Sequence, residues 1–383
     1  MRALRAFSRP KLKIRMAEPP YRSRELVGEL VRAIRDAAKR LPLGLTPIKI
    51  MHVCGTHEHE ISRYALRRYL PENLKLVAGP GCPVCITPAA TIATSMKLAM
   101  EESRPILCAY GDIVRVPIST GSLLKTKSRG ADVRIIYGPL DAARIAKENP
   151  GREVIFFSVG FETTAAPVAS ILLGDLPENL IIYCCHRYVP TAVESLAALD
   201  QNDVTGYLLP GHASVITGYT SYNFLPARFG APAAVAGFEP VDILAGVLSI
   251  VRQVRDRRAV VANCYPRAVR AEGNIRAQET LKQVFDLKDS GWRGIGELPR
   301  TGLILRDEFQ KRNALVHFGI EEEQAEDIMP GCSCHLIMLG RREPSECPLF
   351  GKSCTPEDPR GPCMVGLEGT CRAHYLYREN EDV

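Results

Sequence analysis

The sequence has no apolar run long enough to cross a membrane, because its longest apolar stretch, 154–174, is interrupted by Glu162 and by small or polar residues. It also lacks a strong charge imbalance: 49 Lys and Arg against 43 Asp and Glu give a net charge of +6, spread along the chain. This mild excess does not indicate nucleic-acid binding. With 46% hydrophobic and 24% charged residues, the 383-residue chain is neither disordered nor collagen-like.

Several motifs are missing as well. There is no Gly-x4-Gly-Lys-Ser/Thr loop to indicate ATP binding, and no Cys-x3-Cys-x2-Cys motif of the radical enzymes that use S-adenosylmethionine. The basic segment 1–15 has no apolar core like that of a secretory signal, so we expect a cytoplasmic protein. In that compartment thiols stay reduced, and the thirteen cysteines therefore do not indicate a disulfide framework.

The apolar pattern predicts an α/β fold. Ser23 is a plausible N-cap for a helix over 23–41, since Leu26, Leu30 and Ile34 repeat along one face. Short apolar, β-rich runs then alternate with helix-like stretches, which favours layers of largely parallel, buried strands. The predicted strands are 48–53, 74–78, 106–110, 133–137, 154–159, 180–184, 205–209 and 233–236.

The same rhythm divides the chain into blocks. Residues 1–22 are predicted to be a disordered extension, 23–150 and 151–265 two α/β domains, and 266–383 a helical and cysteine-rich domain. Beyond Pro330 the chain is rich in Cys, Pro and Gly and cannot build a conventional core, so we expect a metal or cross-links there.

Six cysteines, called here the tail cysteines, fall within forty residues near the C-terminus. Zinc is one interpretation, but zinc sites usually contain paired Cys-x2-Cys knuckles, which this segment lacks. Unevenly spaced thiols suit an iron–sulfur cluster whose ligands come from dispersed loops. Six thiols are two more than a cubane needs, and the surplus pair is a candidate redox dithiol. The tail cysteines are Cys332, Cys334, Cys347, Cys354, Cys363 and Cys371.

Two further cysteine motifs follow predicted strands, where α/β proteins place their sites. Cys54 and His57 stand three apart, a spacing that suits a shared metal or a nucleophilic pair and that also occurs by coincidence. Cys82 and Cys85 form a Cys-Pro-Val-Cys motif entering a helix, which resembles a thiol–disulfide centre; the alternative is half of a metal knuckle.

Polar groups flanked by glycine follow two more predicted strands. The first is Gly-Phe-Glu-Thr-Thr, which contains Glu162 and Thr163, and the second is Pro-Gly-His-Ala-Ser, which contains His212 and Ser214. Either group can simply cap a helix. We expect these four side chains to line a cleft and to serve in proton transfer or ligand handling.

Taken together, these motifs resemble the HypD family of [NiFe]-hydrogenase maturation factors, from about residue 25 to the C-terminus. The resemblance implies two α/β domains with mainly parallel sheets around a central cleft, plus a smaller iron–sulfur domain. The motifs that carry it are Cys54-Gly-Thr-His57-Glu-His59, Gly-Pro-Gly-Cys82-Pro-Val-Cys85, Gly160-Phe-Glu-Thr-Thr164, Pro210-Gly-His212-Ala-Ser214, Glu346-Cys347-Pro-Leu-Phe-Gly-Lys-Ser-Cys354, Gly361-Pro-Cys363 and Glu368-Gly-Thr-Cys371.

The resemblance also implies a function. Members of this family act as a scaffold, rather than as conventional turnover enzymes, for assembly of a transient Fe(CN)2CO unit. The implied partners are a HypC-type small chaperone, a HypE-type cyanide donor and, indirectly, the hydrogenase large subunit. No nucleic-acid or membrane partner is expected.

Residue roles carried over from the family are as follows. Cys54 would bind the iron of the Fe(CN)2CO unit, with His57 as a second ligand or as a hydrogen-bond donor to cyanide. Electrons would pass from a 4Fe–4S cluster through the Cys334/Cys363 dithiol and the Cys82/Cys85 pair to the iron. His335 departs from the glycine expected after Cys334. The implied cluster ligands are Cys332, Cys347, Cys354 and Cys371.

Two other functions remain open at this point. A freestanding iron–sulfur thiol–disulfide reductase would use Cys82, Cys85 and the tail cysteines but would not need Cys54 and His57. A zinc-stabilised binding module would need no redox chemistry. Iron and sulfide content distinguishes the zinc module from the other two, and bound cyanide and CO distinguish the scaffold from the reductase.

Overall fold

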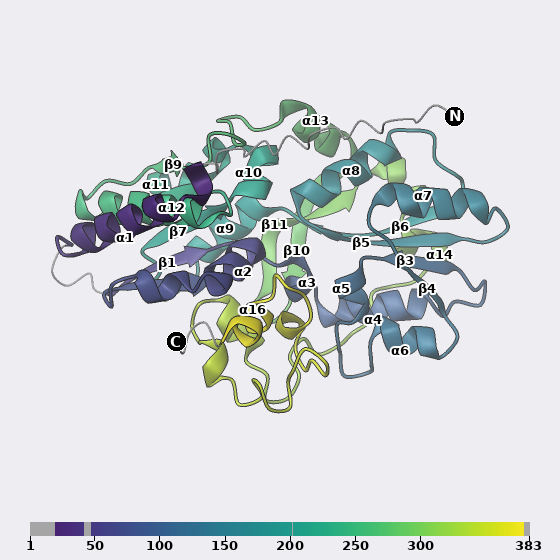
Figure 1. Cartoon of the computed structure of the whole chain (residues 1–383). Helices are drawn as coiled ribbons and strands as arrows, with labels where there is room; N and C mark the ends of the chain where they lie inside the picture. The colour runs from purple at the N-terminus through teal and green to yellow at the C-terminus, as the bar shows by residue number, and fades with distance from the viewer. Residues whose placement is uncertain (1–19, 42–46, 201, 379–383) are drawn as a thin grey trace, which may run out of the picture.

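The computed structural model describes residues 20–41, 47–200 and 202–378, and these residues fold into two β-sheets with helices on both faces (Figure 1). The strands are β1 (Ile48–His52), β2 (Leu74–Ala78), β3 (Ile106–Ala109), β4 (Asp132–Ile135), β5 (Val154–Gly160), β6 (Leu180–Arg187), β7 (Gly206–Pro210), β8 (Ala233–Ala236), β9 (Val261–Asn263), β10 (Phe285–Trp292) and β11 (Gly296–Leu305).

The helices connect these strands and cover both sheets. The α-helices are α1 (Arg24–Ala38), α2 (Gly55–Arg63), α3 (Pro83–Ile86), α4 (Ala89–Leu98), α5 (Gly111–Val114), α6 (Leu123–Ser128), α7 (Pro139–Glu148), α8 (Glu162–Leu172), α9 (Val189–Ala197), α10 (Gly211–Thr217), α11 (Phe224–Phe229), α12 (Pro240–Arg255), α13 (Ile275–Val284), α14 (Ala314–Phe318), α15 (Cys334–Met338) and α16 (Thr370–Tyr377). The 3₁₀ helices are η1 (Pro20–Arg22), η2 (Leu66–Tyr69), η3 (Tyr219–Tyr222), η4 (Asp307–Arg312), η5 (Pro344–Glu346) and η6 (Pro362–Met364).

Sheet A has the strand order β2-β1-β7-β8-β9, and all of its neighbouring pairs are parallel. Sheet B has the order β10-β11-β6-β5-β3-β4, in which β3 to β6 are parallel and the β10–β11 hairpin is added antiparallel. The prediction of an α/β fold with mainly parallel strands is confirmed, and each of the eight predicted runs overlaps one of β1 to β8.

The interiors of both sheets are apolar, as expected for parallel strands covered on both faces. Helices α1 and α12 pack on one face of sheet A, and α9 and α11 pack on the other. Sheet B lies between α7, α8 and α13 on one face and α4, α5, α6 and α14 on the other. The apolar face predicted for the first helix is the face of α1 that packs on sheet A. The Ser23 side chain accepts a hydrogen bond from Leu26 N and is the N-cap of this helix.

The sheets do not follow the predicted sequence blocks. Blocks 23–150 and 151–265 each contribute strands to both sheets, because the chain leaves sheet A after β2, returns to it at β7 and leaves it again after β9. Block 266–383 is divided too, since β10 and β11 extend sheet B. Apolar periodicity shows that a run is buried, but it does not show which strand it pairs with.

Most of the segment predicted to be a disordered extension, residues 1–22, cannot be compared with the structure, because residues 1–19 lie outside the described residues. Pro20–Arg22 forms η1, and Arg22 makes an ion pair with Glu239 at 2.9 Å, so these three residues belong to the folded part of the chain. No helix among the described residues combines the length and the apolar composition needed to cross a membrane.

The cysteine-rich segment after Pro330 lies below the two sheets in Figure 1, next to α2, α3 and the β10–β11 hairpin. Its regular structure consists of short helices, and its side chains form a separate apolar cluster with Cys82, Cys85 and Trp292. The segment thus packs against the carboxyl ends of β1 and β2, where Cys54 and the Cys82 loop begin.

Candidate functional site

Cys54 lies two residues after the end of β1, at the N-cap position of α2. The loop 79–81 lies directly against it: the Gly55 N–H donates to the Gly81 carbonyl at 3.0 Å. A Cβ on Gly81 would lie 2.2 Å from the Cys54 nitrogen and 2.3 Å from its Cα, closer than backbone atoms tolerate. Only glycine therefore allows this approach, and it brings Cys54 and the Cys82 loop together.

The Cys54 thiol is buried, with 7% of the residue exposed. Burial, and then the nearby Glu368 carboxylate, raise its pKa to about 12, although the backbone N–H groups of His57 and Thr56 act in the opposite direction. Glu368 comes from the tail, accepts a hydrogen bond from the Thr56 hydroxyl at 2.8 Å, and has its own pKa raised by burial. At neutral pH Cys54 is therefore a protonated thiol beside a carboxyl group.

His57 is fully buried one turn into α2, and its Nε2 lies 2.9 Å from the Gly237 carbonyl. Burial lowers its pKa to about 3, so the ring is neutral and Nε2 carries the proton that is donated to Gly237. Nδ1 then has a lone pair and, among the described residues, no hydrogen-bond partner. Of the two predicted roles for His57, this tautomer suits a ligand and not a hydrogen-bond donor.

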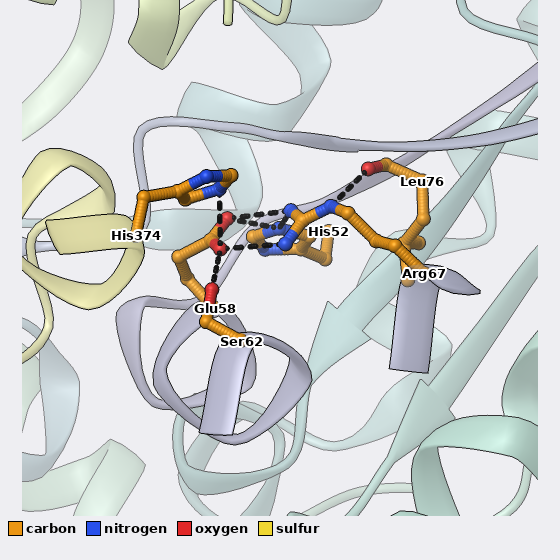
Figure 2. Close-up of polar contacts among 6 residues, drawn as sticks. All are labelled: His52, Glu58, Ser62, Arg67, Leu76 and His374. Atoms are coloured by element: carbon orange, nitrogen blue, oxygen red, sulfur yellow. Dashed lines mark hydrogen bonds and ion pairs between the residues drawn. The ribbon is translucent and has the colours of Figure 1, made fainter. Parts of the chain in front are cut away.

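Glu58 is the most heavily bonded carboxylate of the site (Figure 2). Arg67 donates one hydrogen bond to each of its oxygens at 2.8 Å, Ser62 donates at 2.8 Å, and Nε2 of His52 lies 2.9 Å away. His374 reaches the same carboxylate from α16 at 3.3 Å. Burial acts to raise the pKa of Glu58, but the charge of Arg67 and the bonds from the histidines hold it well below its ordinary value.

The Glu58 carboxylate links α2, near the start of the sequence, to α16, near its end. His374 lies three residues after Cys371 on α16, so its contact with Glu58 holds the tail helix against α2, the helix that follows Cys54. A second contact supports the first: the Tyr377 hydroxyl lies 3.3 Å from Nε2 of His59. Helices α2 and α16 are thus joined by polar contacts between buried or half-buried side chains.

Cys82 caps the short helix α3, and its sulfur accepts a hydrogen bond from the Cys85 N–H at 3.3 Å. The Cys85 sulfur lies 3.9 Å from the Pro362 carbonyl, next to Cys363 in the tail. Burial, followed by interactions with the Cys363 and Cys82 thiols, raises the pKa of Cys85. Interactions with Cys334 and Cys85 lower the pKa of Cys363, which makes it the most acidic thiol of this group.

All six tail cysteines line one small cavity. The remaining lining is apolar or glycine, and every cysteine of the chain is a free thiol. Cys334 interacts with both Cys332 and Cys363, so neighbouring thiols extend from Cys82 and Cys85 into the cavity. Among the described residues, no group of three or more His, Cys, Asp or Glu side chains converges on a position for a single metal ion.

Glu162 is fully buried at the start of α8, and one of its oxygens accepts a hydrogen bond from Val189 N at 2.6 Å. The other oxygen has no partner among the described residues, and burial raises the pKa of this carboxyl to about 7. Thr163 is exposed and lines a surface pocket together with Pro83 and Val84. Thr163 therefore lies beside the Cys82 loop, while Glu162 points into the protein interior.

His212 and Ser214 lie at the start of α10. The exposed His212 ring packs on Phe238, with 3.9 Å between the ring centroids. The His57 ring also contacts Phe238, with 5.1 Å between the centroids. The buried Ser214 hydroxyl donates to the Pro210 carbonyl at 2.7 Å, an ordinary contact within a helical turn. The fold brings His212 near His57 and gives Ser214 a local structural contact.

Sequence reasoning missed the residues that hold this site together. Glu58 and Glu368 stood inside quoted motifs, but nothing in the pattern assigned them a role. Arg67 and His374 belong to no motif, and their common partner, Glu58, lies 9 and 316 residues away in sequence. Such pairings arise from tertiary contacts and leave no local signal.

Comparisons with known proteins identify the family of the chain. The family model described as "HypD: Hydrogenase formation hypA family" matches residues 25–378. The chain is 43% identical to the hydrogenase maturation factor HypD2 of Bradyrhizobium diazoefficiens, over 94% of this chain and 97% of the relative. It is 40% identical to the hydrogenase maturation factor HypD of Escherichia coli, over 94% of this chain and 98% of the relative.

An archaeal relative shows the same extent of similarity. The chain is 41% identical to a putative hydrogenase expression/formation protein of Methanocaldococcus jannaschii, over 91% of this chain and 97% of the relative. The matches cover the strand-end motifs and the tail cysteines alike, because they extend over nearly the whole length of both chains. The chain therefore belongs to the HypD family.

Proposed function

We propose that this protein acts in hydrogenase maturation, as the cytoplasmic scaffold on which the Fe(CN)2CO unit is assembled. It would work with a HypC-type small chaperone, receive cyanide through a HypE-type donor and supply the hydrogenase large subunit. The relatives named as hydrogenase maturation factors support the general role. One observation carries the rest: Cys54, the Cys82/Cys85 pair and the tail cysteines lie in one continuous neighbourhood.

Cys54 is the proposed ligand for the substrate iron. A thiolate is a soft ligand that suits low-spin iron carrying cyanide and CO. Because the buried Cys54 thiol is protonated at neutral pH, it must lose its proton when iron binds, and metal binding supplies the driving force for that loss. Glu368 is the nearest carboxylate acting on Cys54 and is the proposed acceptor of this proton.

His57 is the proposed second protein ligand of the same iron. Its neutral ring presents an unpartnered Nδ1, and its orientation is fixed by the Gly237 carbonyl. Fixing the donor proton on Nε2 leaves Nδ1 available as a lone-pair donor, as is usual for histidines that bind metals. Glu58, in turn, positions α2 and thus both Cys54 and His57.

The tail cavity is the proposed site of a resident 4Fe–4S cluster. Its lining of six cysteines fits such a group, because each of the four irons takes one thiolate and the ligands need not meet at a single point. When bound, the cluster would supply one-electron transfer. The proposed ligands are Cys332, Cys347, Cys354 and Cys371.

Cys334 and Cys363 would then remain as a dithiol beside Cys85. Cys363, whose pKa is lowered, is the proposed attacking thiolate in exchange with a Cys82–Cys85 disulfide. In that exchange the Cys82–Cys85 bond breaks and a Cys334–Cys363 bond forms, so two electrons and two protons pass to Cys82 and Cys85. The contact between Cys85 and the Pro362–Cys363 segment supports this direction of transfer.

A freestanding thiol–disulfide reductase is the second candidate, and the same continuity of thiols favours it. The two functions differ at Cys54, which a reductase does not require. The tight packing of Gly81 on the Cys54 backbone favours the scaffold, since it fixes a third, separate cysteine beside the redox pair.

Infrared spectroscopy of the protein purified without oxygen, together with a HypC-type partner, tests the proposal. We expect bands of bound cyanide and CO in the wild type, loss of these bands in Cys54→Ser, and their retention in Cys264→Ser. Cys264 is a half-buried thiol at the edge of sheet A and serves as the matched control. Bands of wild-type intensity in Cys54→Ser would contradict the scaffold function.

Iron and sulfide analysis of the same preparations tests the cofactor. We expect about four irons and four sulfides per chain from one cubane, and additional iron, without sulfide, where Cys54 carries the Fe(CN)2CO unit. Zinc in place of iron, with no sulfide, would contradict both redox functions and favour a zinc-stabilised module.

A further inference from the structure

Arg293 stands at the tip of the β10–β11 hairpin, between the two groups of cysteines. Its backbone N–H donates to the Ile86 carbonyl at 2.8 Å, directly after Cys85. The next residue, Gly294, lies against α15, and a Cβ on it would be 2.6 Å from the Cβ of His335. The tip is therefore wedged between the Cys82/Cys85 helix and the helix that begins at Cys334.

The Arg293 side chain is buried, with 1% of the residue exposed, and the acceptors of its hydrogen bonds among the described residues are backbone carbonyls. Nε donates to the Asp327 carbonyl at 2.7 Å, and Nη2 donates to the Pro117 carbonyl at 3.0 Å. Nη1 has no acceptor among the described residues, and no carboxylate in that part of the chain lies within ion-pair distance of the guanidinium. A buried charge that makes no ion pair is costly, and arginine does not lose its proton to avoid that cost.

The charge of Arg293 interacts with Asp327 and with three of the tail cysteines. Burial lowers the pKa of the guanidinium, whereas Cys334, then Asp327, Cys363 and Cys332, act to raise it. The Asp327 carboxylate is already engaged, since its oxygens accept from Ala89 N at 2.8 Å and Gly294 N at 2.9 Å. The structure thus holds a permanent cation beside α3 and α15, the helices that carry Cys85 and Cys334, and Cys334 lines the cavity of the tail cysteines.

We propose that Arg293 is a positioning residue whose fixed positive charge raises the reduction potential of the iron–sulfur cluster held by the tail cysteines. This inference rests on the proposed function, which places a 4Fe–4S cluster in the cavity. Reduction adds one electron to the cluster, and it forms or breaks no bond and moves no proton at Arg293. Because the electron increases the negative charge beside a buried cation, the cation favours the reduced state, and the low polarity of the site strengthens the effect.

Redox titration of the reconstituted full-length protein, with dithionite as the electron donor, tests the inference. We expect Arg293→Met to disfavour reduction at least tenfold, which is about 59 mV for a one-electron couple. Arg293→Lys keeps the charge and is expected to stay within about threefold of the wild type, or half that shift. Equal shifts in both variants, or no shift in Arg293→Met, would overturn the inference.

Arg187 provides the matched control. It is another buried arginine that contacts the same hairpin, and its three nitrogens donate to the Gly291 and His186 carbonyls. The cysteines that act on its charge are Cys184 and Cys185, outside the tail. Arg187→Met is expected to leave the potential within about threefold of the wild type; a shift as large as that of Arg293→Met would overturn the inference.

A second variant keeps the inference testable if Arg293→Met does not fold. Asp327→Asn removes the carboxylate that offsets the charge of Arg293 and is expected to shift the potential upward. An unchanged or lower potential in Asp327→Asn would overturn the inference. Iron and sulfide content distinguishes failure of the proposed function from failure of this inference. A wild type without iron and sulfide contradicts the proposed function. A cluster that is present but has the same reduction potential in the wild type, Arg293→Met and Asp327→Asn contradicts this inference alone.

Discussion

Cys54 directly follows a strand of a parallel sheet, whereas the tail cysteines lie among short helices and loops after Pro330. The position of Cys54 is determined by backbone contacts with Gly81 and by the ladder of β1 with β2 and β7. The tail has no ladder comparable to these within its described residues, and the interior of its segment is a cavity lined by thiols.

The difference concerns what stabilises each region. Around Cys54, the buried strands and the packed helices α1 and α12 supply the stability. The tail is a small region with little apolar interior, and such regions depend on a metal or on contacts with the rest of the protein. Glu58 is the exception, since it belongs to the first region and also holds α16 of the second.

Removal of bound iron should show the largest contrast between the regions. We expect backbone amides of 332–378 to exchange at least tenfold faster after anaerobic chelation, because the cavity loses the group that its thiols bind. Amides of β1 should change little, since β1 is held by its ladder in sheet A. Hydrogen exchange before and after chelation measures both; equal loss in the two segments would remove the distinction.

Glu58→Gln should weaken both regions at once. Arg67 and His374 would lose a buried charged partner, and we expect a loss of about 3 kcal/mol in the free energy of unfolding at pH 7. Urea denaturation is the measurement. Glu60→Gln, on the same helix with only long contacts to His59 and Arg63, is the control and should cost less than about 0.5 kcal/mol.

The stabilities of the wild type and of Glu58→Gln should also depend differently on pH. The pKa of Glu58 is well below its ordinary value in the folded state, so its stabilising contribution is fully present above about pH 4.5 and is lost as the pH falls toward the folded-state pKa. The wild type should therefore lose more stability than Glu58→Gln between neutral pH and pH 3. Parallel curves for the two proteins would contradict this account.

Gly81→Ala should disturb the Cys54 region selectively. The new methyl group would overlap backbone atoms of Cys54, and overpacking of this kind costs about 2 kcal/mol. We also expect less cyanide- and CO-bearing iron on Cys54, with the iron–sulfur content of the tail unchanged. Gly151→Ala, where a Cβ meets no atom within 4 Å, is the control and should leave stability and iron binding unaltered.

Glu162→Gln should give the smallest effect, and one of opposite sign. Burial raises the pKa of Glu162 to about 7, so the folded wild type binds more protons than the unfolded chain between about pH 4.5 and 7, and its stability falls as the pH rises through that range. Glutamine keeps the acceptor for Val189 N without a charge, and we expect a net gain of about 1 kcal/mol at pH 8. Denaturation at pH 5 and pH 8 measures it, and a loss at pH 8 would show that the carboxylate is stabilised by contacts other than these.

Much of the fold could be predicted from local pattern. Runs such as 154–159 are continuously apolar and rich in β-forming residues, which is why they appear as strands of a parallel sheet. The partition into two sheets could not be predicted, because β7 pairs with β1 across more than 150 residues and nothing in either run specifies that partner. The hairpin β10–β11 was missed since its residues alternate irregularly in burial.

Cysteine spacing alone determined which residues are chemically unusual: the thiols after two strands and the six in the tail are recognisable in the sequence by their close spacing. Tertiary structure decided the environment of each one. The burial that protonates Cys54, the tautomer of His57, the carboxylate that joins α2 to α16 and the cation at Arg293 all come from residues distant in sequence. Charges and protons respond to what surrounds a group in space, and a linear pattern does not record that.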